Sequence, residues 1–115
     1  MTSYRKFNDY LIEKLHDPEE AMAFLTVSIE DYAEDHDTEA LMLALRLIAE
    51  AQGGIHQLSL KAHLNRQNLY KILTGKTIPR FDTALSIING LGFQISLAPI
   101  DPSKHLPAHQ SNTPC

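Results

Sequence analysis

The stretch of sequence that decides the fold is IHQLSLKAHLNRQNLYKILTG, residues 55–75. Its pattern predicts two short helices, over residues 56–62 and 65–73, with a tight turn between them. Two short helices that cross at close range on either side of such a turn form a helix-turn-helix, and the residue types that this unit requires can be checked one at a time.

The turn has the residue types that it needs. Ser59 is small enough to lie where the two helices cross, Leu64 supplies an apolar plug for the turn, and Asn65 is among the best N-cap residues for the second helix. Glycine is favoured in the turn because φ is positive there, and this chain has His63. Histidine is one of the few other residues enriched in that region, so we expect the turn to form with some strain.

The second helix of the pair has two different faces. Leu69, Ile72 and Leu73 recur at helical spacing and predict a buried face. The opposite face is polar and carries Arg66, Gln67, Tyr70, Lys71 and Thr74. In a helix-turn-helix the second helix lies in the major groove, with its N-terminal residues at the base edges. The sequence therefore predicts binding to double-stranded DNA.

Charge is divided unevenly along the chain. The formal net charge is −4, but residues 1–50 hold twelve acids and four bases, whereas residues 51–115 hold six bases and two acids. Between Ile55 and Phe81 there is no acid, and the five bases are Lys61, Arg66, Lys71, Lys76 and Arg80. This asymmetry favours an anionic polymer as the partner of the second half and a different partner for the first. Two ordinary solvated surfaces would give the same asymmetry, so charge alone does not decide.

Further helices are predicted on both sides of this unit. Asp17 and Pro18 mark the start of a helix that ends near Glu34, and Glu20 can close a capping box. A helix over residues 38–51 is apolar on most sides, is expected to be central, and is ended by Gly53-Gly54. A third helix is expected over 82–89, with Gly92 as terminator. Its inward-facing residues are expected to be Phe81, Ala84, Leu85, Ile88 and Leu91.

Residues 93–97 predict one short C-terminal β-strand, because Phe93, Ile95 and Leu97 alternate with polar residues. A lone strand leaves its backbone groups unpaired and is not stable in water. The chain offers only a weak second strand, around residues 4–7. We therefore expect a homodimer in which the C-terminal strand pairs with its copy about a two-fold axis.

The 115 residues divide into a short helical or irregular lead-in over 1–16, a helical DNA-binding domain over 17–98, and a tail over 99–115. The tail holds four of the six prolines and almost no apolar residues, so we expect it to be disordered. Pro107 interrupts the helix that His105 and His109 would need to bind a metal together. The single cysteine, Cys115, excludes a disulfide within one chain.

Several classes of protein are disfavoured. No apolar run approaches the ~18 residues of a membrane span, and the N-terminus lacks the apolar stretch of a signal peptide, so we expect a cytoplasmic protein without a membrane partner. The acids are not paired across an evident pocket, the histidines are scattered, and no glycine-rich phosphate loop is present. We expect no enzymatic activity, no cofactor and no metal site.

Residues 55–75 resemble the lambda-repressor-like, or Xre/Cro-type, DNA-binding domain. A longer resemblance extends from about Asp17 to Leu97. It is carried by the run from Asp17 through Ile29, the Gly53-Gly54 pair, the Leu-Tyr-Lys of residues 69–71 and the Gly-Lys-Thr-Ile-Pro-Arg-Phe of residues 75–81. In these residues the chain is similar to the probable addiction-module antidote family, the HigA-like antitoxins. That family usually has glycine where this chain has His63.

The resemblance implies a mainly all-α, lambda-repressor-like helical bundle, to which the sequence adds the C-terminal strand. It implies a protein that represses its own operon and neutralises a small RelE/HigB-like toxin. Because dimers of a helix-turn-helix bind half-sites about one helical turn apart, we expect the operator to be an inverted repeat. Toxins that cleave RNA are basic because their substrate is anionic, which would suit the acidic first half. Residues from about Phe7 to Asp37 are then expected to help hold the toxin, while the basic half stays free for DNA.

The residues expected to contact DNA are Gln57, Asn65, Arg66, Gln67, Asn68, Tyr70, Lys71, Lys76, Thr77 and Arg80. Amide side chains such as Gln67 and Asn68 can bond bidentately to adenine, and Arg66 or Lys71 to guanine. Gln57 lies near the start of the first helix and is expected to contact phosphate, where the helix N-terminus also helps. Further phosphate contacts are expected from Tyr70, Lys76, Thr77 and Arg80. For Tyr70 the simpler interpretation is that its ring covers the core and does not contact DNA.

Two further functions stay open. One is a helical protein-interaction module without affinity for DNA, which salt-dependent DNA binding would exclude. The other is a phage or plasmid repressor with no toxin partner, which a neighbouring short gene for a basic protein would exclude.

Overall fold

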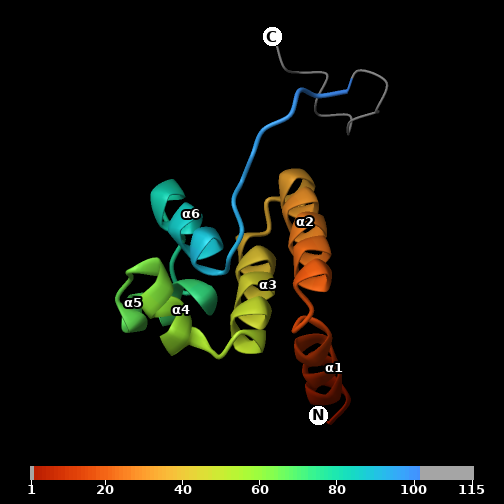
Figure 1. The fold of residues 1–115 in the computed structure, drawn as a ribbon, viewed down its shortest axis with the longest axis vertical. Coiled ribbons are helices and arrows are strands. Elements are labelled where there is room, and N and C mark those ends of the chain that lie inside the picture. Colours follow the sequence, from red (N-terminus) through yellow and green to blue (C-terminus); the bar gives the residue numbers. More distant parts are fainter. Residues whose placement is uncertain (1, 102–115) are drawn as a thin grey trace.

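The computed structural model describes residues 2–101, in which all the regular structure is helical. In chain order the helices are α1 (Thr2–Lys14), α2 (Pro18–Asp35), α3 (Thr38–Ala51), α4 (Ile55–Ala62), α5 (Arg66–Leu73) and α6 (Phe81–Gly90) (Figure 1). The mainly helical fold class is thus confirmed. Most of the tail that was expected to be disordered, with His105, His109 and Cys115, lies outside the described residues.

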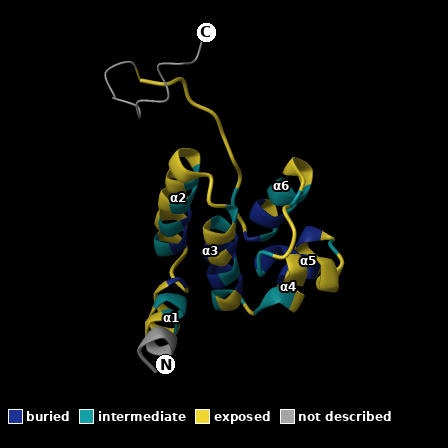
Figure 2. Cartoon of the chain, turned by 180° about the vertical axis from the view of Figure 1, so that it is seen from behind, coloured by how far each residue is buried: buried dark blue, intermediate teal, exposed yellow. Residues whose placement is uncertain are grey.

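The centre of the bundle is α3. It packs against α1 and α2 on one side and against α4 and α5 on the other (Figure 1). Leu45 and Ile48 have no exposed surface, and the buried residues of the neighbouring helices gather around them (Figure 2). A helix that is apolar on most sides is stable only when several elements cover it. The prediction of a central helix over 38–51 is therefore confirmed.

The start of α2 is capped as the sequence predicts. Asp17 accepts a hydrogen bond from the backbone N–H of Glu19 at 3.0 Å, and Pro18 is the first helical residue. Glu20 does not close a capping box; its carboxylate lies 3.8 Å from the ammonium of Lys14 instead. Ala21 and Leu25 are buried where α2 packs against α3.

The N-terminal segment is a regular helix, which the sequence predicted incompletely. The structure has α1 over residues 2–14, so a strand around residues 4–7 is wrong. Leu11 and Ile12 pack against the core and Leu15, just after the helix, is 3% exposed. These apolar contacts with the bundle favour a helix there, since most helical stability in proteins comes from tertiary packing.

Helix α6 packs against α4 at a place where a side chain would not fit. A Cβ atom on Gly90 would lie 2.9 Å from Leu58 Cδ1 and 3.1 Å from Ala62 Cβ. The expectation that Phe81 faces inward is wrong, because its side chain is 76% exposed. Phe81 is the first residue of α6, and Ile87, which is fully buried, fills the core in this part of the bundle.

The expected strand over 93–97 is absent, and within residues 2–101 no strand forms. Gly92 ends α6 with a positive φ of 96°, and the N–H of Phe93 donates to Ile88 O at 3.1 Å. Beyond Phe93 the chain has no regular structure, and residues 94–96 lie beside α2, where they line a hollow with Met22, Thr26 and Glu30 (Figure 1). A ladder needs a second strand, and the segment that was the other candidate is helical.

Candidate nucleic-acid interface

Helices α4 and α5 are joined by the tight turn that the sequence predicts, and we call them the α4–α5 pair. His63 ends α4 with φ 57° and ψ 44°, in the left-handed region. The backbone oxygen of Ser59 accepts a hydrogen bond from the N–H of His63 and another from that of Leu64. Both bonds go to a single carbonyl of the last turn, as is usual where a helix ends with a left-handed residue. The positive φ predicted at His63 is confirmed.

The crossing and the second cap also form as predicted. Ser59 is 5% exposed, and its hydroxyl donates to the carbonyl of His56 at 2.6 Å. Asn65 Oδ1 accepts a hydrogen bond from the backbone N–H of Asn68 at 2.9 Å, which caps α5. The buried residues of α5 are Leu69, Ile72 and Leu73. The apolar face of α5 is thereby held against α3 and α4, and its polar face points outward.

All ten residues predicted to contact DNA are exposed. Five of them line one groove: Arg66, Gln67, Tyr70, Lys71 and Lys76. Arg46 and Glu50 of α3 form another wall, and Gly54, Ile55 and His56 bring the N-terminal end of α4 to the same place. Tyr70 lines this groove and is 47% exposed.

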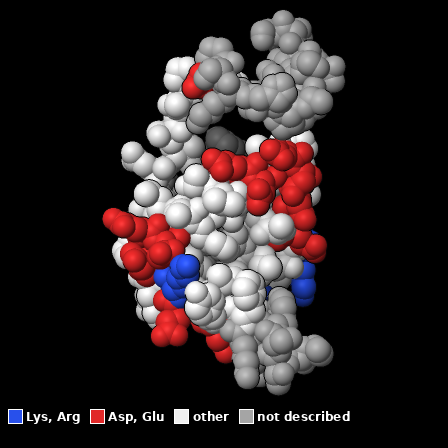
Figure 3. Space-filling model, turned by 90° about the vertical axis from the view of Figure 1, so that its right-hand side faces the viewer, with Lys and Arg blue, Asp and Glu red and all other residues white. Residues whose placement is uncertain are grey.

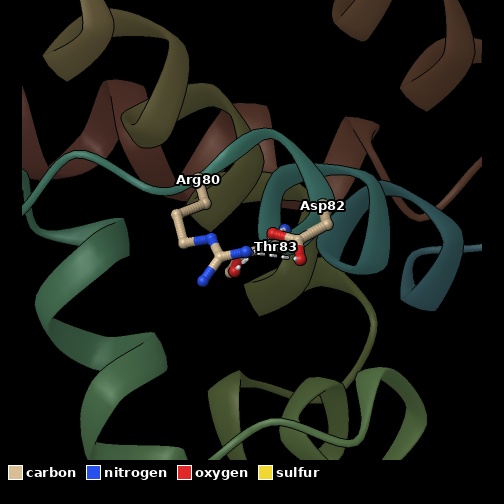
Figure 4. A network of polar contacts seen from close by, with 3 residues as sticks. All are labelled: Arg80, Asp82 and Thr83. Atoms are coloured by element: carbon tan, nitrogen blue, oxygen red, sulfur yellow. Dashed lines mark hydrogen bonds and ion pairs between the residues drawn. The ribbon is translucent and has the colours of Figure 1, made fainter.

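The other five predicted residues are exposed but do not line the groove: Gln57, Asn65, Asn68, Thr77 and Arg80. Arg80 lies beside an acid, because its guanidinium is 3.4 Å from the carboxylate of Asp82 (Figure 4). Asp82 also accepts a hydrogen bond from the N–H of Thr83. The acid-free stretch ends at Phe81, one residue before this partner. Both charged side chains are well exposed, so the pair is weak.

Arg46 is the residue of the groove that the sequence did not reveal. It belongs to the half of the chain that holds twelve acids, and its guanidinium lies 3.8 Å from Glu50, one turn later on α3. Only the packing of α3 against α5 brings this charge next to Arg66 and Lys71. No local pattern in the sequence signals that approach.

The groove is thus an open surface with four bases from three segments and one acid, which is already paired. Such a surface can neutralise several neighbouring phosphates. Among residues 2–101 no three metal-ligating side chains come together. None of the helices described is long and apolar enough to cross a membrane.

A family model described as "probable addiction module antidote protein" matches residues 4–99 of the chain. The match therefore includes all six helices apart from the first residues of α1. Comparison with curated proteins and with solved structures finds no match.

Proposed function

Because the chain belongs to the probable addiction module antidote family, we propose that it binds operator DNA through the α4–α5 pair and represses its own operon. An antidote of an addiction module acts against a toxin, so the family role brings a toxin partner with it. We further propose that the chain is a cytoplasmic, HigA-like antitoxin of the Xre type, and that its toxin is a small basic RelE/HigB-like protein.

The observation that carries the DNA proposal is the polar face of α5 and the groove beside it. The apolar side of α5 is fully used in the core, since Leu69, Ile72 and Leu73 are 0 to 3% exposed. The first turn of its outer side presents Arg66, Gln67 and Asn68, the end of the helix that enters the major groove in this motif. The bases beside it, Arg46, Lys71 and Lys76, can then contact phosphates of the DNA backbone.

The test is a gel shift with the DNA upstream of the protein's own gene, at increasing salt. Each phosphate contact should contribute about −0.9 to the slope of log K against log salt. Lys14→Ala is a matched control, because Lys14 is an exposed base at the end of α1 that does not line the groove. Absence of binding at low salt would overturn the proposal and leave a protein-interaction module.

We also propose that the protein is a homodimer joined through residues 93–97. The backbone of this segment makes no ladder within the described chain, and Ile95 and Leu97 are 46% and 96% exposed. Antiparallel pairing with the same segment of a second copy would satisfy those groups. Two α5 helices would then bind half-sites about one helical turn apart in an inverted repeat. A monomer by light scattering at micromolar concentration would contradict this.

A further inference from the structure

The side of α2 that faces away from α3 is an exposed helix face, bordered at Glu30 by residues 93–96, with which Glu30 lines a shallow hollow. The residues along it recur every three or four positions and are all exposed: Glu19, Ala23, Val27, Glu30 and Glu34. The buried residues Ala21 and Leu25 lie on the opposite side of the helix, against α3. At ~1.5 Å per residue this stripe is about 22 Å long. We call it the α2 outer face.

The α2 outer face has an apolar centre with an acid at each end. Val27 is 54% exposed, with Ala23 one turn before it. Glu19 lies beyond Ala23, and Glu30 and Glu34 follow Val27. A protein interface has the same arrangement, with apolar contacts at its centre and polar groups at its rim.

The surroundings of this face select the charge of whatever binds it. Residues 7–37 contain ten acids and one base, Lys14, which already pairs with Glu20. Figure 3 views the molecule from the side on which α2 lies, where acidic side chains gather in patches around uncharged surface. DNA would be repelled there, and so would a second copy that presented the same face. A cationic protein surface would be attracted.

The acids at the C-terminal end of α2 oppose the stability of their own helix. Asp31 and Glu34 lie near the negative end of the helix macrodipole, where cations are favoured, and the last turn holds no base. Neither carboxylate forms an ion pair or hydrogen bond with another described residue. Residues that oppose the stability of their own helix in this way are found mostly at functional sites. A cation from a partner would supply the missing charge.

We propose that the α2 outer face is the docking surface for a cationic face of the toxin, centred on Val27. This inference rests on the proposed antidote role. It assigns the toxin and the DNA to two different surfaces of the molecule. Helix α3 lies between α2 and the α4–α5 pair, so the two partners would bind on different sides of the molecule (Figure 1).

The experiment measures binding of the full chain to the protein encoded by the adjacent gene of the same operon. The variant is Val27→Lys combined with Glu30→Lys. Lysine is a better helix former than valine, so α2 is retained. Leu60→Lys is the matched control, because Leu60 is 58% exposed on α4 and lies outside the α2 outer face. We expect the double variant to raise Kd about tenfold or more, and the control to leave it unchanged.

Each outcome decides a different point. If the wild type and the double variant bind equally well, the docking surface is wrong and the antidote role stands. If the wild type does not bind the adjacent gene product at all, the toxin assignment and the docking surface both fail. Glu34→Lys alone is the second variant, in case the double variant does not fold, because it adds a favourable charge at the C-terminal end of α2. It should also weaken binding to the toxin. Unchanged binding would overturn the proposal.

Discussion

Helices α2 and α5 use their inner faces in the same way and their outer faces in opposite ways. Each buries an apolar stripe against the central α3, with Ala21 and Leu25 in α2 and Leu69 and Ile72 in α5. Outside, α2 carries the acids Glu19, Glu30 and Glu34, whereas α5 carries no acid. Packing of the core therefore does not explain why the outer faces of α2 and α5 differ in charge, because a solvent-facing position tolerates either sign of charge. What differs is the partner that each outer face can accept.

The N-cap residues differ in charge in the same way as the outer faces of these helices. Asp17 caps α2 and Asp37 caps α3, each with a carboxylate oxygen that accepts a backbone N–H. Asn65 caps α5 with a neutral amide oxygen at nearly the same distance. Asparagine and aspartate are equally good caps. An amide at this position therefore keeps the end of α5 free of negative charge at no cost to the helix.

The largest effect should come from reversing charge in the groove. Lys71→Glu combined with Lys76→Glu removes two bases and adds two acids where we propose phosphate to lie. We expect operator binding to fall by about a hundredfold or more, and the salt slope to drop by roughly 0.9 per lost contact. Gel shifts measure both. Toxin binding should be unchanged, and a parallel loss of it would break the separation of the two faces.

A smaller effect is expected at the proposed base contact. Gln67→Ala should cost about 1–3 kcal/mol for the preferred operator and relax base preference at one position. Lys76→Ala, by comparison, should weaken all DNA sequences alike. Binding to a set of single-base operator variants distinguishes the two. Equal loss across all sequences for Gln67→Ala would mean that this side chain contacts the backbone rather than a base.

Two substitutions at Asn65 separate the cap from the charge. Asn65→Ala should lower the free energy of unfolding by about 1 kcal/mol, because the bond to the N–H of Asn68 is lost. Asn65→Asp should preserve stability and still weaken DNA binding through repulsion of phosphate. Denaturant unfolding and gel shifts on both variants provide the measurement. Undiminished DNA binding by Asn65→Asp would show that charge at this end of α5 is unimportant.

The smallest effect concerns the stability of α2. Glu34→Lys should raise the free energy of unfolding by about 0.3–1 kcal/mol, because a cation replaces an anion at the negative end of the helix. Glu19→Lys at the opposite end is the matched comparison and should lower stability by a similar amount. Thermal unfolding at low salt is the measurement. The same sign for both variants would refute the dipole argument.

Features that depend on a few neighbouring residues were determined by the sequence itself. Helix α3 has the predicted bounds, α2 differs by one residue at its end, and Asn65 and His63 take the cap and left-handed conformations expected of them. Capping bonds, turn geometry and helical periodicity span five residues or fewer, so their pattern is visible in the chain. Family membership is likewise carried by the sequence, since the match runs over residues 4–99.

Tertiary structure decided which distant residues meet. Arg46 enters the groove only because α3 packs against α5, and Ile87 rather than Phe81 is buried only because of how α6 lies on α4. The alternation over residues 93–97 predicted a strand, but a strand exists only when another backbone lies beside it. Residues 4–7 cannot form a strand beside residues 93–97, because they belong to α1. That helix is held by apolar contacts with the bundle, where Leu11 is partly buried and Leu15, just after the helix, is buried.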